Sequence, residues 1–152
     1  MARSNIAMSP GSGTYAMKIM CTTDTNWSLD GIGVCLKDAD LGEEWCEGSK
    51  HFMWGDWNAL GEFGGDEDEN NPFHMKCEWI GDDLQQFVTF DTANTELEMI
   101  YDSNTGEMRF KINGEYLGST VQNLNSVGDL YWCVGADPSW DCRHDVTIVD
   151  YK

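Results

Sequence analysis

The chain has 152 residues, of which 27 are acidic and nine are Lys or Arg, so its formal net charge is −18. This charge argues against a nucleic-acid partner, because phosphate backbones need a basic face. It also disfavours anionic membrane surfaces, and no apolar run approaches the ~18 residues of a membrane-spanning helix. Hydrophobic residues make up 41% and aromatic residues 12%, which is enough for one folded domain.

Residues 1–13 are predicted to be an N-terminal arm, and residues 14–152 a single domain. The arm has one basic residue and no continuous apolar segment, so it does not read as a secretory signal. Its large apolar residues, Met1, Ile6 and Met8, are too few to form a core. We therefore expect the arm to pair with an edge strand, either of its own subunit or of a neighbour in a homo-oligomer or larger assembly.

Short apolar or alternating segments separated by turn residues predict strands along the domain. Sixteen glycines punctuate the chain and disfavour long helices. Residues 82–86 can form one helical turn at most. The chain is therefore expected to be an all-β antiparallel sandwich or barrel with little or no helix. The predicted strands are 14–21, 30–36, 51–55, 85–90, 96–101, 108–112, 130–135 and 146–149.

The clearest hairpin joins residues 97–101 to residues 108–112. Apolar residues alternate in both runs, and a polar turn, residues 102–106, connects them. Phe110 is expected to be buried. The dipeptide Asn113-Gly114 follows at once and predicts a second turn, because it suits both positive-φ positions of a type I′ turn.

Acidic residues concentrate in residues 37–83, which hold 14 Asp and Glu against three Lys. The same stretch contains four tryptophans and several glycines, a composition typical of long loops. Long loops on a rigid sandwich commonly carry function. Residues 66–71 can attract Ca²⁺ weakly by charge, but a solvated acidic loop is the favoured interpretation, and no EF-hand spacing is present.

No pattern in the chain predicts catalysis, a metal site or a cofactor. Glu96 and Glu98 alternate with inward-facing apolar residues, so they suit a solvent face rather than a glycosidase cleft. The histidines, His51, His74 and His144, are scattered without zinc spacing. We therefore expect a non-catalytic protein.

The redox state of the cysteines decides the expected compartment. There are six and no C-x-x-C pair, and several stand among apolar residues. Reduced, buried thiols and a cytoplasmic protein are favoured. Disulfides would instead indicate an extracellular one. The cysteines are Cys21, Cys35, Cys46, Cys77, Cys133 and Cys142.

Residues 101–118 resemble the C-terminal half of SPRY domains, with an Asp, a short turn, a strand containing Phe, then Asn-Gly and a second Gly. Residues 130–135 are similar to a later strand of that family, although Trp132 replaces its usual Pro, and Gly31-Ile-Gly-Val34 is similar to an early strand. Asn94-Thr95 replaces the usual Gly-Asp. The resemblance implies a concanavalin-like sandwich of two antiparallel sheets, and a module that binds peptide segments through loops at one rim.

The favoured function is a protein-interaction module of SPRY type that acts as a scaffold for a basic protein or peptide. Exposed aromatic residues would supply contact area, and acidic neighbours would select the partner. A structural subunit of a filament or organelle lattice is one alternative, and a carbohydrate-binding β-sandwich is another. The residues expected to line the binding rim are Trp45, Asp56, Trp57, Phe63 and Trp140.

Overall fold

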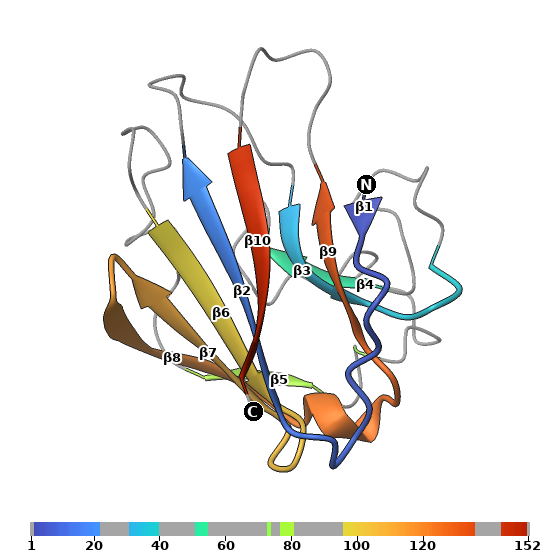
Figure 1. The fold of residues 1–152 in the computed structure, drawn as a ribbon. Helices are drawn as coiled ribbons and strands as arrows, with labels where there is room; N and C mark the ends of the chain where they lie inside the picture. The colour runs from blue at the N-terminus through green and yellow to red at the C-terminus, as the bar shows by residue number, and fades with distance from the viewer. Residues whose placement is uncertain are drawn as a thin grey trace.

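The computed structural model describes residues 2–21, 31–39, 51–54, 73, 77–80, 96–135 and 144–151. Within these ranges the chain forms two antiparallel β-sheets that face each other (Figure 1). The only helical element in the described ranges is a 3₁₀ turn, η2 (Leu124–Ser126). The all-β expectation and the two-sheet sandwich are therefore confirmed.

The larger sheet has six strands in the order β10-β2-β6-β7-β8-β5, and the smaller has four in the order β1-β9-β3-β4. The six-stranded sheet consists of β10 (His144–Tyr151), β2 (Thr14–Cys21), β6 (Glu96–Asp102), β7 (Glu107–Ile112), β8 (Glu115–Gln122) and β5 (Glu78–Ile80). The four-stranded sheet consists of β1 (Ala2–Arg3), β9 (Tyr131–Gly135), β3 (Gly31–Cys35) and β4 (His51–Trp54).

The core lies between the two sheets and follows the period-2 alternation of the strands. On β6, Leu97, Met99 and Tyr101 are buried, and on β7 Phe110 is fully buried. Trp132 of β9 packs into the same cluster from the opposite sheet. The Trp that replaces the Pro usual in SPRY domains is therefore a core residue.

The predicted hairpin and turn are confirmed. Leu97 pairs with Ile112 across β6 and β7, and the next turn has φ 49° at Asn113 and 86° at Gly114. Both positive angles are those of a type I′ turn, which Asn and Gly adopt with little strain. The predicted strands include neither β5 nor β8. The predicted strand 85–90 and the helical turn 82–86 lie outside the described residues.

Glu98 departs from the solvent-facing role expected for it. It lies on the outer face of β6, yet it is only 4% exposed. Its register partners are Lys18 of β2 and Lys111 of β7. Long lysine stems can cover a shorter neighbour while their ammonium groups stay in water, so a central strand position can be buried on the outer face too.

The N-terminal arm pairs with the edge of its own four-stranded sheet. Ala2 and Arg3 pair with β9, and Met8 bridges to Leu130 through backbone hydrogen bonds in both directions. Met8 is fully buried in the core. The expected edge pairing therefore occurs within one subunit, and the described pairing needs no neighbouring chain.

Ser103 fastens the end of the arm to the six-stranded sheet. Its hydroxyl accepts from the amides of Ser12 (3.0 Å) and Gly13 (2.8 Å) and donates to the Gly13 carbonyl (2.6 Å). Its own backbone also exchanges hydrogen bonds with Gly11 and Gly13. Ser103 is completely buried, so the bonds are shielded from water and hold the start of β2 in place.

Candidate functional site

The turn between β6 and β7 is held by both local and distant contacts. The Asn104 amide donates to the Asp102 carboxylate (2.9 Å), an Asx turn, and the Gly106 amide donates to the Asp102 carbonyl (2.8 Å). Gly106 has φ 79°, and a Cβ there would overlap the side chain of Asn125. Glycine is therefore required twice, for its backbone angle and for the close approach of η2.

An open groove of about 450 Å³ lies beside this turn, on the outer face of the six-stranded sheet. Strand alternation directs these side chains away from the core, because their neighbours in sequence face inward. The lining is mostly polar and carries two carboxylates and one guanidinium. The lining residues are Thr14, Ile100, Asp102, Thr105, Glu107, Arg109 and Gln122.

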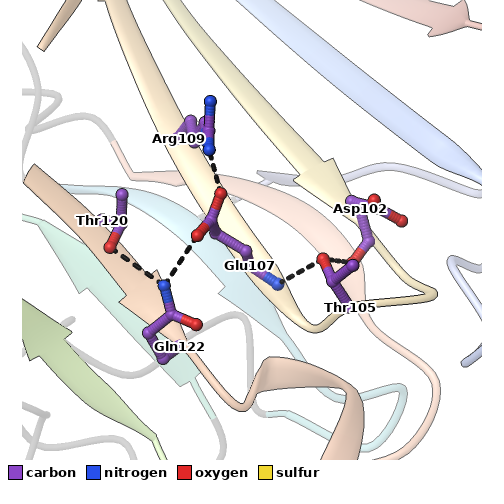
Figure 2. Close-up of polar contacts among 6 residues, drawn as sticks. All are labelled: Asp102, Thr105, Glu107, Arg109, Thr120 and Gln122. Atoms are coloured by element: carbon purple, nitrogen blue, oxygen red, sulfur yellow. Dashed lines mark hydrogen bonds and ion pairs between the residues drawn. The ribbon is translucent and has the colours of Figure 1, made fainter.

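Glu107 is the centre of the hydrogen-bond network in this groove (Figure 2). One carboxylate oxygen accepts from Nε of Arg109, and the other accepts from the amide nitrogen of Gln122 at 2.7 Å. Gln122 also donates to the Thr120 hydroxyl at 3.1 Å. The network crosses β7 and β8, so the polar side chains are pre-oriented by rigid strands.

The same contacts set the charge state of the groove. The hydrogen bond from Arg109 and then that from Gln122 hold the pKa of Glu107 below its usual value. In return, Glu107 raises the pKa of Arg109. Both groups are therefore ionised near neutral pH, which is the arrangement of a polar recognition surface rather than of a general acid poised to transfer a proton.

A basic and aromatic cluster adjoins the groove on β7 and β8. The Nζ of Lys111 lies 4.5 Å from the ring centroid of Tyr116, and the Cζ of Arg109 lies 5.9 Å from it. Tyr116 is 56% exposed. Tyr and Arg are among the residue types that contribute most at protein interfaces, so this outer face is a candidate contact surface.

The predicted rim residues, Trp45, Asp56, Trp57, Phe63 and Trp140, all lie outside the described residues, as does the acidic segment 66–71. The outer-face residues were not singled out from the sequence. Their signal was the alternation of β7, since Arg109 and Lys111 must face away if Met108 and Phe110 face inward. What the alternation lacked was any indication that β8 would supply Gln122 and Tyr116.

No group of three His, Cys, Asp or Glu residues in the described part of the chain has the arrangement to hold a metal ion. Nor does any helix in the described ranges have the length and apolar character needed to cross a membrane.

Comparison of the backbone with solved structures identifies a similar architecture. The SPRY domain of human HERC1 matches with a TM-score of 0.56 and 13% sequence identity, over 97% of this chain and 80% of that one. The chain has a SPRY-like fold. The sequence itself matches no protein-family model and no curated protein. The SPRY-like resemblance of residues 101–118 is therefore confirmed at the level of the fold, where β6, β7 and β8 form consecutive antiparallel strands.

Proposed function

We propose that this SPRY-like chain is a non-catalytic protein-interaction module that binds a basic protein or peptide through acidic, aromatic loops. The observation that carries the proposal is the SPRY-like architecture over 97% of the chain, since domains of this fold generally serve as interaction modules. The net charge of −18, concentrated in residues 37–83, supports a basic partner.

The ends of the described strands support one rim as the binding surface. β4 ends at Trp54, which pairs with Ile32 near the start of β3, and the start of β3 pairs with Gly135 at the end of β9. The segments that contain Trp57 and Trp140 therefore leave the sheet from the same end. The segment that contains Trp45 leaves from the opposite end, between Cys35 and His51.

A peptide-display selection against the folded chain tests this proposal. We expect enriched peptides to be basic, and their association rate to fall as salt rises, because exposed charges are screened over about 8 Å at physiological ionic strength. Trp57→Ala and Trp140→Ala should each lower the affinity for the selected peptide by about tenfold or more, as expected for aromatic interface residues.

Two variants serve as controls in this experiment. Trp45→Ala reports whether the segment from the opposite end contributes, and Tyr116→Ala removes the exposed aromatic residue of the outer face. If Tyr116→Ala abolishes binding while Trp57→Ala and Trp140→Ala leave it intact, the outer face is the binding surface and the rim proposal is wrong. If the selected peptides lack basic residues, or if their association rate does not change with salt, the proposal that acidic charge selects a basic partner is wrong.

A further inference from the structure

Two cysteines occupy neighbouring strands on the outer face of the four-stranded sheet. The register pairs Cys35 of β3 with Tyr131 of β9, and Gly33 with Cys133, so the cysteines are diagonal neighbours on one face. Val34, between the two β3 positions, packs into the main core. Because side chains alternate along a strand, the thiols point away from that core.

The thiols nevertheless sit in a small apolar cluster of their own. Cys35 and Cys133 are each 1% exposed, and they pack with Ala39 and Tyr131. Neither is in a disulfide, and the two side chains belong to one buried cluster. The chain thus keeps a pair of reduced sulfur atoms in mutual contact, outside the main core.

The N-terminal arm places a cation beside the pair. Arg3 of β1 lies opposite Cys133 in register, and its Cζ lies 5.2 Å from the ring centroid of Tyr131. One guanidinium nitrogen donates to the carbonyl of Leu36 (3.5 Å) and to that of Lys37. β1 has only two residues, so this edge strand beside β9 is held by few backbone hydrogen bonds and can open to admit a small reagent.

These contacts make the two thiols chemically different. The hydrogen bond from Cys133 lowers the pKa of the Cys35 thiol, which outweighs the effect of burial, and Arg3 lowers it further. Burial, with the hydrogen bond to Cys35 next, raises the pKa of Cys133 well above its usual value. Cys35 is therefore the more acidic thiol and the better candidate for the attacking sulfur, and Cys133 is the better candidate for the resolving thiol.

We propose that Cys35 and Cys133 form a dithiol modification site that a peroxide converts into a disulfide between β3 and β9, next to the edge strand of the N-terminal arm. The Cys35 thiolate attacks one peroxide oxygen, the O–O bond breaks, and Cys35 becomes a sulfenic acid while hydroxide leaves. The sulfur of Cys133 then attacks the Cys35 sulfur, the S–O bond breaks, and water leaves with the Cys133 proton. The hydroxide takes up the proton that Cys35 had released. The two thiols are thus oxidised by two electrons, and one peroxide is reduced to two waters.

The strand geometry predicts that this disulfide is reversible. Diagonal neighbours in an antiparallel pair have Cα atoms about 7–8 Å apart, whereas relaxed disulfides span about 4.4–6.8 Å. Forming the disulfide therefore requires β3 and β9 to move closer together, which leaves the disulfide strained. Strained disulfides are the ones that thiols reduce readily, so glutathione should restore the pair.

Peptide mapping of the full chain after treatment with hydrogen peroxide tests the proposal. The reduced wild-type protein is oxidised while folded, alkylated under denaturing conditions and digested. We expect a Cys35–Cys133 cross-linked peptide that disappears on incubation with glutathione. Cys133→Ser keeps a hydrogen-bond donor beside Cys35 but cannot form the disulfide, so it should stop at a Cys35 sulfenic acid that dimedone traps. Cys35→Ser should leave Cys133 unmodified over the same period.

A labelling experiment on the wild-type chain keeps the test independent of whether the variants fold. Cys77 is also buried, at 8% exposure, and serves as the internal reference. With a small alkylating reagent near neutral pH, we expect Cys35 to react about tenfold faster than Cys77, because a lowered pKa raises the fraction of reactive thiolate. In Arg3→Gln, the pH at which Cys35 reaches half its maximal alkylation rate should rise, because the guanidinium that lowers the thiol pKa is gone. A mere increase in exposure would raise the rate without moving this midpoint. Peroxide products that pair other cysteines, or a Cys35 rate no greater than that of Cys77, would overturn the proposal.

Discussion

Replacement of Ser103 by alanine should loosen the attachment of the arm. The change removes the acceptor of two backbone amides, those of Ser12 and Gly13. An amide left without its partner in a buried site costs about 1–3 kcal/mol. Ser12 is exposed and Gly13 is half-buried, so water can compensate in part. We expect a loss of about 2–3 kcal/mol in the free energy of unfolding for the two amides together.

Chemical denaturation followed by tryptophan fluorescence measures this loss. For a chain of this size each kcal/mol lowers Tm by about 2–4 °C, so Ser103→Ala should melt about 4–12 °C below the wild type. Ser126→Ala is the matched control. Its hydroxyl donates to the Asn123 carbonyl at 2.7 Å but is exposed, so a change within about 0.5 kcal/mol is expected.

Hydrogen exchange identifies where the stability is lost. The amides of Ser12 and Gly13, which donate to the Ser103 hydroxyl, should exchange faster in Ser103→Ala. Amides in the β6–β7 hairpin should exchange faster only to the extent that the global stability falls. A variant as stable as the wild type, with unchanged exchange at Gly13, would refute the assignment of Ser103 as the attachment point of the arm.

Three further predictions follow from single residues. Gly106→Ala should lower the free energy of unfolding by about 1–3 kcal/mol, because φ is 79° and a Cβ would overlap Asn125; Gly118→Ala, which meets nothing within 4 Å, should change it by less than about 1 kcal/mol in urea unfolding. Folding lowers the pKa of Glu107, so its carboxylate contributes fully to the free energy of unfolding above the unfolded pKa, and this contribution is lost as pH falls through the folded pKa. In Glu107→Gln the free energy of unfolding should therefore depend less on pH in this acid range. Equal pH profiles for the two proteins would contradict the prediction. Burial raises the pKa of Tyr101, so the free energy of unfolding should fall as pH rises above about 10, where the unfolded tyrosine ionises. In Tyr101→Phe this fall should be smaller. Ultraviolet titration of the folded proteins should count the same number of tyrosines ionising at about pH 10 in the variant and in the wild type, because the folded Tyr101 stays protonated there.

The sequence by itself determined the elements whose causes are local. Alternation over residues 97–112 predicted the β6–β7 hairpin and the burial of Phe110, because side chains point to opposite faces of a strand. Asn113-Gly114 predicted its turn, because few other residues tolerate two positive φ angles in succession. The resemblance of residues 101–118 to SPRY domains predicted the arrangement of these strands in a sandwich.

The tertiary structure alone decided which distant residues meet. Ser103 and Gly13 are 90 positions apart, and no local pattern marks either as the partner of the other. The same holds for Cys35 and Cys133, which strand order brings to adjacent positions only once β3 and β9 pair. Sequence alternation reports the face on which a side chain lies, but not the strand that will lie beside it. The choice of neighbour depends on how the whole chain buries its apolar faces, and for the arm that choice was β9 of its own subunit.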